Sequence, residues 1–269
     1  INGGLVSREH ISYSEFKIWN ECPHKHKLTY IDGLAGFEGN EYTAFGTAIH
    51  SVCEQSLLNE DLDVSSHFKE VFLEELKKLP DHVKSEISSK TVTNMRDQGL
   101  VLAPLAIPAL GEYFKDFEVS SVEEMLYEPI PEFDGKDFKF KGFIDLVVKT
   151  SDGKYHIIDW KTCSWGWKPK KKSDAMTTYQ LTFYKYYFAK KHGIDPKNIE
   201  TYFALLKRTA KSDNVEIFRV TSGERKTKNA LNLLKKALHN ISEGKHLKNK
   251  SSCETPFGMC EFWKTEHCQ

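Results

Sequence analysis

Apolar positions recur at a helical spacing through most of the first half of the chain. Residues 43–58 place Phe45 and Ile49 on one face, which predicts an amphipathic helix. A shorter helix is expected over residues 12–20. Residues 64–117 follow the same spacing and are expected to be mostly helical, with breaks at their prolines. The first half of the chain is therefore predicted to be rich in helix.

After about residue 120 the pattern changes to short runs of β-branched and aromatic residues between turn formers, which is typical of strands. The expected strands cover residues 124–129, 138–148, 154–162, 199–208 and 215–220. Two helical patterns interrupt and follow these strands, at residues 173–192 and 223–244. The sequence thus predicts an α/β fold with a central mixed β-sheet flanked by helices.

Composition and charge narrow the functional classes. The 269 residues include 38 basic and 38 acidic ones, so the net charge is zero, and 39% are hydrophobic. This balance is typical of a folded protein and argues against one held on nucleic acid by overall charge, although a local basic groove is compatible with it. No stretch approaches the roughly 18 apolar residues that cross a bilayer, and residues 1–10 lack the pattern of a signal peptide. A cytoplasmic protein is expected, with an organellar or nuclear one left open.

The first candidate site is a hairpin. Asp152-Gly153 separates two hydrophobic runs, and a turn centred there places Asp145 opposite Asp159. Facing carboxylates about 5 Å apart repel each other unless a cation lies between them. Lys161 falls on the same face, which completes the equipment for metal-assisted phosphodiester hydrolysis. The same pattern is compatible with a salt bridge between Asp145 and Lys161 that leaves Asp159 in solvent.

Four motifs follow one another along the chain. They are Phe45-Gly-Thr-Ala-Ile-His50, Gly142-Phe-Ile-Asp145, Ile157-Ile-Asp159-Trp-Lys161-Thr162 and Tyr179-Gln180-Leu-x-x-Tyr184. Together they resemble the PD-(D/E)xK nuclease superfamily, specifically its RecB-like branch, over about residues 12–268. The resemblance implies a restriction-endonuclease-like core at residues 121–245, between a helical part at residues 1–120 and a Cys-rich tail at residues 246–269. All three are expected to form one compact unit.

The resemblance also implies a metal site. Asp145, Asp159, the main-chain carbonyl of Trp160 and the imidazole of His50 are expected to bind Mg²⁺ or Mn²⁺, with Lys161 orienting the attacking water. On its residue type alone, a helical histidine such as His50 is more often a packed or surface residue.

The helix motif implies two further roles. Gln180 is expected to form a hydrogen bond near the catalytic lysine, and Tyr184 is expected to lie near the DNA. At positions i and i+4 the two side chains share a helix face, so both can equally belong to an aromatic helix wall. Glu128, in the strand before the hairpin, is a further acidic candidate.

Half of the six cysteines lie near the end of the sequence, at Cys253, Cys260 and Cys268. With Cys22 they resemble the one-plus-three arrangement that holds a [4Fe-4S] cluster in several RecB-like nucleases. Four thiolates suit zinc equally well, and unrelated free cysteines are a third interpretation. Cys22 and the tail enclose a very long loop, so the expected effect of a cluster is structural.

A basic, aromatic segment follows the hairpin directly. We expect it to bind DNA, with phosphates on its lysines and bases on its indoles. The residues concerned are Trp165, Trp167, Lys168, Lys170, Lys171 and Lys172. A solvated flexible loop is the alternative.

The sequence therefore predicts a metal-dependent DNA exonuclease that acts on single strands or duplex ends, in recombination, repair, CRISPR adaptation or phage replication. It contains no G-x-x-x-x-G-K-[ST] motif, so a helicase motor is expected on another chain. Two other classes remain open: a catalytically silent DNA-binding or scaffold subunit, and a zinc-stabilised interaction protein.

Overall fold

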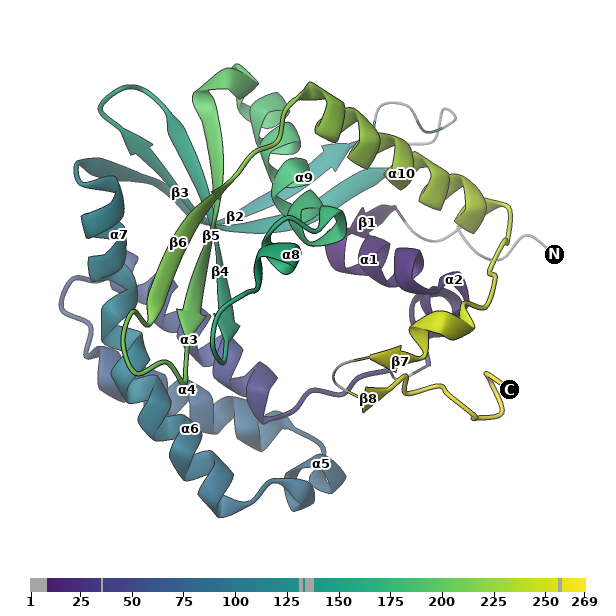
Figure 1. Cartoon of the computed structure of the whole chain (residues 1–269), viewed down its shortest axis with the longest axis horizontal. Helices are drawn as coiled ribbons and strands as arrows, with labels where there is room; N and C mark the ends of the chain where they lie inside the picture. Colours follow the sequence, from purple (N-terminus) through teal and green to yellow (C-terminus); the bar gives the residue numbers. More distant parts are fainter. Residues whose placement is uncertain (1–8, 35, 131–132, 134–137, 256–257) are drawn as a thin grey trace. The chain divides into compact units, whose positions relative to one another are not determined.

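The structure is a computed structural model that describes residues 9–34, 36–130, 133, 138–255 and 258–269 (Figure 1). Residues 1–8, which include most of the segment considered for a signal peptide, lie outside the described part. In the described ranges, no helix combines the length and the apolar character that crossing a membrane requires.

Within the described residues, a six-stranded sheet forms the centre of the fold, with β1, β3, β4, β5 and β6 in that order and β2 also paired with β3. The strands are β1 (His10–Ser12), β2 (Phe117–Pro129), β3 (Lys139–Thr150), β4 (Tyr155–Cys163), β5 (Ile199–Lys207) and β6 (Val215–Val220). β1 runs parallel to β3 and β4 parallel to β5, whereas β3–β4 and β5–β6 are antiparallel. The prediction of a mixed sheet in an α/β fold is confirmed.

The β3–β4 hairpin has the register that the Asp152-Gly153 turn predicts. Leu146 pairs with Ile158, and Val148 pairs with His156. Gly153 adopts a φ of 80°, which glycine reaches without the steric cost of a side chain. The turn dipeptide therefore sets which residues of the two strands face each other.

The helices agree closely with those predicted. They are α1 (Tyr13–Glu21), α2 (Pro23–His26), α3 (Glu41–Leu58), α4 (Val64–Lys78), α5 (Asp81–Glu86), α6 (Ser89–Leu102), α7 (Ala106–Phe114), α8 (Pro169–Lys172), α9 (Ala175–His192) and α10 (Glu224–Ser242). One expected break is wrong, because Pro108 lies in the first turn of α7, where an amide N–H would have no partner within the helix.

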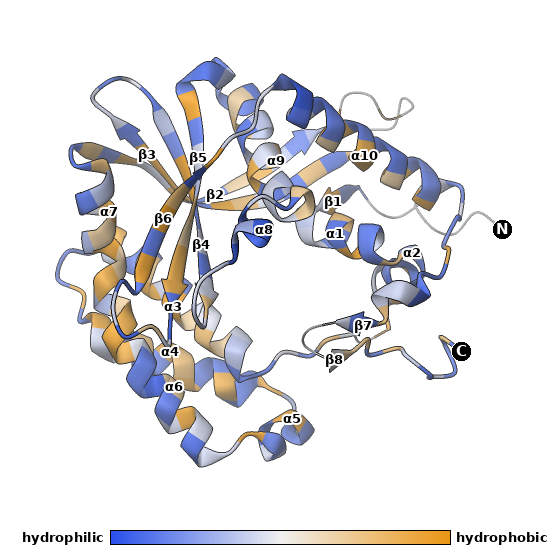
Figure 2. Cartoon of the chain, in the orientation of Figure 1, coloured by the Kyte–Doolittle hydropathy of each residue, from blue (hydrophilic) through white to orange (hydrophobic). Residues whose placement is uncertain are grey.

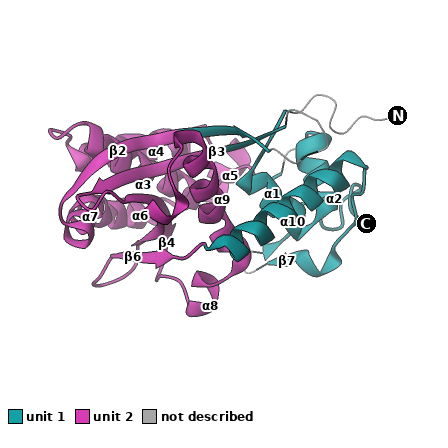
Figure 3. Ribbon diagram, turned by 90° about the horizontal axis from the view of Figure 1, so that it is seen from above, with its two compact units in different colours: residues 1–37, 125–142, 223–269 teal, residues 38–124, 143–222 magenta. Residues whose placement is uncertain are grey.

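The chain divides into two compact units, each assembled from segments that are distant in the sequence (Figure 3). Unit 1 contains residues 1–37, 125–142 and 223–269, and unit 2 contains residues 38–124 and 143–222. Each unit therefore contains residues from more than one of the three ranges expected from the sequence, which are residues 1–120, 121–245 and 246–269.

Unit 2 contains the main hydrophobic core. Helices α3, α4, α6 and α7 bury their apolar faces together with Trp160 and Ile158 of β4 and Ala204 of β5. Because side chains alternate along a strand, Asp159 and Lys161 point to the opposite face, where α9 packs on β4 and β5. Full burial of each large apolar side chain contributes about 1.5–3 kcal/mol, so this core holds α3 firmly on β4.

Unit 1 joins the first and last parts of the described chain. Helix α1 packs against α10, which buries Leu234 and Leu238 on one side and exposes polar residues on the other (Figure 2). A short two-stranded sheet, β7 (Glu254–Thr255) and β8 (Gly258–Met259), follows α10. Unit 1 therefore contains Cys22 and the three cysteines near the end of the sequence, Cys253, Cys260 and Cys268.

Candidate active site at the fork of β3 and β4

The candidate site lies where β3 and β4 separate. Their ladder of paired residues ends at Leu146 and Ile158, so Asp145 and Asp159 occupy the next positions in the same register. Asp145 Oδ2 there accepts a hydrogen bond from the main-chain N–H of Trp160 at 2.7 Å. This side-chain bond takes the place of a ladder bond and holds the Asp145 carboxylate in the fork.

Helix α3 brings His50 to the same point. The helix begins at a reciprocal cap, in which Asn40 Oδ1 accepts from the N–H of Thr43 at 3.1 Å and Thr43 Oγ1 accepts from the N–H of Asn40 at 2.9 Å. His50 Nδ1 lies 3.6 Å from Asp145 Oδ2. Burial lowers the pKa of the His50 imidazole, although the charge of Asp159 and a hydrogen bond to the Trp160 backbone act in the opposite direction. The ring is therefore held in the neutral form that can donate a nitrogen lone pair.

The alternative interpretation, a salt bridge between Asp145 and Lys161, has no counterpart among the ion pairs of the described residues. Lys161 Nζ lies 2.7 Å from Asp159 Oδ2, and Asp159 is only 1% exposed rather than in solvent. Burial acts to lower the pKa of Lys161, but the charges of Asp159 and Asp145 outweigh it and raise that pKa. Lys161 is thus a fixed ammonium beside both acids, as the metal-site interpretation expects.

One ammonium does not balance the negative charge at the fork. Burial, followed by the charge of Asp159, raises the pKa of the Asp145 carboxyl well above its ordinary value. Glu123 of β2 and Glu54 of α3 add to this charge, since burial and then Glu54 and Asp159 raise the pKa of Glu123. The site therefore concentrates carboxylates around a single lysine.

Neither of these glutamates was identified from the sequence as a residue of the site. Glu123 lies five residues before the acid named from β2, at a backbone φ of 49°, and such a left-handed residue interrupts the alternation that a strand pattern relies on. Glu54 carried a usable signal, because it lies four residues after His50 and so on the same face of α3.

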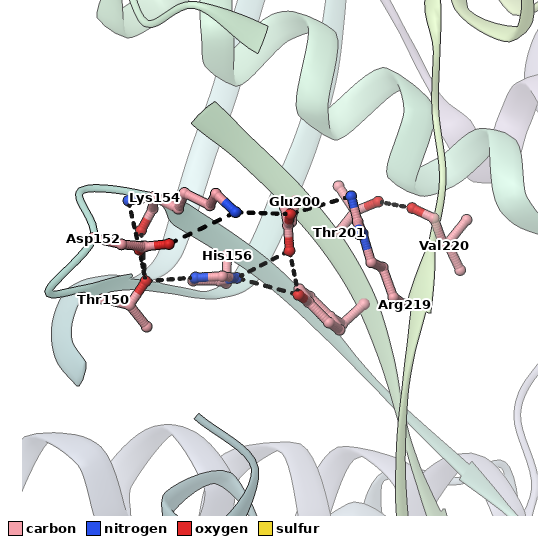
Figure 4. Close-up of polar contacts among 9 residues, drawn as sticks. Thr150, Asp152, Lys154, His156, Glu200, Thr201, Arg219 and Val220 are labelled. Atoms are coloured by element: carbon pink, nitrogen blue, oxygen red, sulfur yellow. Dashed lines mark hydrogen bonds and ion pairs between the residues drawn. The ribbon is translucent and has the colours of Figure 1, made fainter. Parts of the chain in front are cut away.

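Glu200 of β5 shows how a carboxylate is neutralised elsewhere in the same sheet (Figure 4). Glu200 Oε1 lies 3.1 Å from Arg219 Nη2 and 3.5 Å from Lys154 Nζ, and Glu200 Oε2 accepts from Tyr202 Oη at 2.7 Å. These partners lower the pKa of Glu200 against the opposing effect of burial. At the fork, by contrast, burial and the neighbouring carboxylates raise the pKa of Asp145 and of Glu123.

The donor set at the fork fits a divalent cation. Asp159 Oδ2 is buried and, despite its proximity to Lys161 Nζ, receives no well-directed hydrogen bond in the described structure. Carboxylate oxygens, a main-chain carbonyl and a neutral imidazole are ligands that Mg²⁺ or Mn²⁺ accept. Among the described residues, however, no three His, Cys, Asp or Glu side chains form a complete metal-holding group. The ligand set of His50, Asp145, Asp159 and Trp160 stays a prediction.

Helix α9 carries the two residues of the last motif, Gln180 and Tyr184. Gln180 Nε2 donates to Tyr184 Oη at 3.1 Å, and in the described residues the structure records no hydrogen bond from Lys161 Nζ to Gln180 Oε1. Tyr184 is 5% exposed, so its ring offers little surface to DNA. Both predicted roles stay predictions.

The basic, aromatic segment separates into packed and exposed residues. Trp167 contacts the rings of Phe203 and Phe218 edge-on, at centroid distances of 5.1 and 6.2 Å, so it packs against the sheet. Trp165 is 78% exposed. Lys172 forms an ion pair with Glu216, whereas Lys168, Lys170 and Lys171 of the same segment are exposed. DNA binding by these residues stays a prediction, with Trp165 best placed for stacking.

The cysteines of unit 1 are all free thiols. Cys22 Sγ accepts hydrogen bonds from the N–H groups of Lys25 at 3.5 Å and Asn249 at 3.4 Å. Burial, and then the charges of Cys268 and Cys22, raise the pKa of Cys253. The charges of Cys22 and Cys268 thus act on Cys253, but within the described residues these cysteines do not form a metal-holding group.

Comparisons with known proteins agree with this geometry. The sequence profile of the PD-(D/E)XK nuclease superfamily matches residues 10–265. The crystal structure of a "putative exonuclease" from Eubacterium rectale is similar over 95% of this chain and 86% of its own, with 13% identity and a TM-score of 0.57, which supports the fold. A second structure, titled SSO0001, is 14% identical over 87% of this chain and 78% of its own, and its TM-score of 0.41 is too low to support an argument. The search of curated proteins finds no match.

Proposed function

The chain belongs to the PD-(D/E)XK nuclease superfamily, and on this premise we propose that it is a metal-dependent DNA exonuclease acting on single strands or duplex ends. Family membership supports nuclease activity and, in general, a need for Mg²⁺ or Mn²⁺. The choice of ends over internal sites is part of the proposal. Its support is the description of the similar Eubacterium rectale structure as a "putative exonuclease", together with exposed lysines and Trp165 in the segment that follows β4.

One observation carries the proposal. At the fork, Asp145 and Asp159 are held together at the cost of a raised Asp145 pKa, and Lys161 alone supplies a fixed positive charge among the described residues there. A protein that needed these acids only for folding would neutralise them, as it does around Glu200. The unbalanced acids instead support a site for a cation, and so argue against a catalytically silent scaffold.

Each residue then has a chemical role in our proposal. His50, Asp145, Asp159 and the Trp160 carbonyl would hold the ion, which when bound polarises a phosphoryl oxygen and acidifies water. Lys161 would orient the attacking water and stabilise charge that develops on the phosphate. Water attack in line with the leaving oxygen would give products with 5′-phosphates.

The test is hydrolysis of end-labelled single-stranded and duplex DNA with Mg²⁺ or Mn²⁺. We expect Lys161→Ala to lower kcat by about 10²–10³-fold, the effect of removing one charge-stabilising donor. Lys154→Ala is the matched control, because this lysine lies at the far end of β4 among neutralised acids (Figure 4). Equal activity of wild type and Lys161→Ala would remove Lys161 from the mechanism. Internal cleavage of circular single strands would refute the exonuclease assignment.

We further propose that Cys22, Cys253, Cys260 and Cys268 hold a [4Fe-4S] cluster that stabilises unit 1. The support is the effect of the Cys22 and Cys268 charges on Cys253 and the N–H groups directed at Cys22 Sγ, which suit a thiolate ligand. Anaerobically purified protein should contain iron and sulfide and absorb visible light. Stoichiometric zinc without iron would favour a zinc site instead, and the absence of both metals would refute the proposal.

The proposed nuclease function also includes a motor subunit on a separate chain and a role in recombination, repair, CRISPR adaptation or phage replication.

A further inference from the structure

Arg208, directly after β5, carries a charge that its neighbours fix in position without neutralising it. Its Nη1 donates to Gln98 Oε1 at 2.7 Å and its Nη2 to Ser164 Oγ at 3.0 Å. Both acceptors are neutral, and the described residues place no carboxylate within ion-pair distance of this guanidinium, unlike Arg219 beside Glu200. A guanidinium that is already oriented and still carries its full charge is well suited to bind a phosphate.

An exposed aromatic ring lies beside this charge, and a second follows one of its hydrogen-bond partners in the sequence. The Arg208 guanidinium carbon is 5.1 Å from the centroid of the Tyr42 ring, a cation–π distance that keeps the ring in one orientation. Tyr42 is nevertheless 52% exposed, and Trp165, next to Ser164, is 78% exposed. Oriented, exposed rings next to a positive charge are the elements with which proteins stack the bases of single strands.

The sheet places this group at the same edge as the candidate active site. β4 and β5 are parallel, and Cys163 pairs with Lys207 at their carboxyl ends, the edge at which α/β sheets bind ligands. The Arg208 N–H also donates to the Cys163 carbonyl at 2.8 Å. Ser164 and Arg208 thus directly follow two paired strands, which hold both residues in place.

Helix α3 gives the distance from the fork. Tyr42 and His50 lie eight positions apart on one face of the helix, which corresponds to about 12 Å along its axis. Ser164 lies three residues beyond Lys161, about 10 Å farther along the chain of β4. The two estimates agree, so the group lies about 10–12 Å from the residues of the fork, a distance that a short stretch of single strand can cover.

We propose that Arg208, Tyr42 and Trp165 form a subsite for the single-stranded part of the DNA substrate. The guanidinium binds one backbone phosphate and the rings stack on bases a few nucleotides from the bond that is cut. This inference rests on the proposed nuclease function and deepens it, because the subsite makes a strand of several nucleotides a better substrate than a very short one.

The first test measures binding without hydrolysis. Fluorescein-labelled twenty-nucleotide oligo(dT) is titrated in EDTA at several salt concentrations, and binding is followed by anisotropy. We expect Arg208→Gln to weaken binding about tenfold and to reduce the salt slope by about 0.7, the contribution of one phosphate on a single strand. Tyr42→Ala should weaken binding by a similar factor through lost stacking, with the slope unchanged. Arg208→Lys should keep the slope.

Arg96→Gln is the matched control for charge, because Arg96 is exposed on α6 and paired with Asp97. If Arg208→Gln binds DNA as Arg96→Gln does, the subsite is refuted. Melting temperatures of all variants show whether each one is folded, and Tyr42→Ala tests the subsite independently of Arg208.

The second test compares substrate lengths with Mg²⁺ or Mn²⁺. The ratio of kcat/KM for the twenty-nucleotide strand to that for a dinucleotide should fall about tenfold in Arg208→Gln and stay constant in Arg96→Gln. An unchanged ratio in Arg208→Gln would overturn the subsite. Failure of wild type to cut either substrate would instead refute the proposed function, and the binding experiment would still decide on the subsite.

Discussion

Replacing Gly99 by alanine is a stringent test of the core that supports the candidate site. A Cβ at this position of α6 would lie 1.9 Å from Cζ and 2.1 Å from Cε1 of Phe68. The Phe68 ring is fully buried and packs against Phe72 and against Phe45 of α3, the helix that carries His50, at centroid distances of 5.6 and 5.5 Å. The ring therefore has no free space into which it can move.

The magnitude follows from two opposing effects. Inserting a methyl group into a packed core costs about 1–3 kcal/mol, whereas alanine is favoured over glycine in a helix by about 1 kcal/mol. Because the contact of 1.9 Å places the cost at the upper end of that range, we expect Gly99→Ala to lower the free energy of unfolding by about 2 kcal/mol.

Gly111 of α7 provides the matched control, because a Cβ there meets no atom within 4 Å. Gly111→Ala should raise the free energy of unfolding by about 0.5–1 kcal/mol through helix propensity alone. Urea denaturation followed by circular dichroism measures both changes. If Gly99→Ala also stabilised the protein, the tight packing of α6 on Phe68, and with it our account of the support beneath α3, would be refuted.

Three further predictions concern the fork. Burial and the charge of Asp159 raise the pKa of Asp145, so its ionisation opposes folding once the pH exceeds the unfolded carboxyl value of about 3.9. Without metal, Asp145→Asn should therefore melt several degrees above wild type at pH 7, and this advantage should vanish near pH 3; an advantage independent of pH would contradict the electrostatic account. Saturating Mg²⁺ should raise the melting temperature of wild type but not that of Asp145→Asn, since binding to the folded state alone stabilises it. Because burial lowers the pKa of His50, the apparent pKa of the acidic limb in the pH profile of kcat/KM should lie below 6.5. An apparent pKa above that value would exclude His50 as the titrating ligand.

The parts of the fold that sequence predicts well depend on local patterns. The register of β3 and β4 follows from one turn dipeptide, and the span of β6, residues 215–220, follows from its apolar run. Strand β1 was missed because three residues give no pattern, and its pairing of Ile11 with Phe140 joins segments far apart in the chain.

The residues of the candidate site also divide into those that a local pattern predicts and those that it does not. Asp145, Asp159 and Lys161 could be placed together because a two-residue period relates them directly to the turn. Glu123 could not, because a left-handed backbone at that position changes the direction of the side chain without leaving a mark in the sequence. Trp167 was predicted to stack on bases, but sequence does not distinguish an indole that packs on Phe203 from one that faces solvent.

The interleaving of the two units has a consequence for synthesis on the ribosome. Every segment of unit 2 has been translated by residue 222, whereas unit 1 still lacks α10 and the cysteine-containing tail at that point. Its N-terminal helix α1 can contact β1 and α2 at once, but it lacks α10, which emerges more than 200 residues later. Folding during translation thus favours completion of unit 2, which holds the candidate site, before α1 gains its contact with α10.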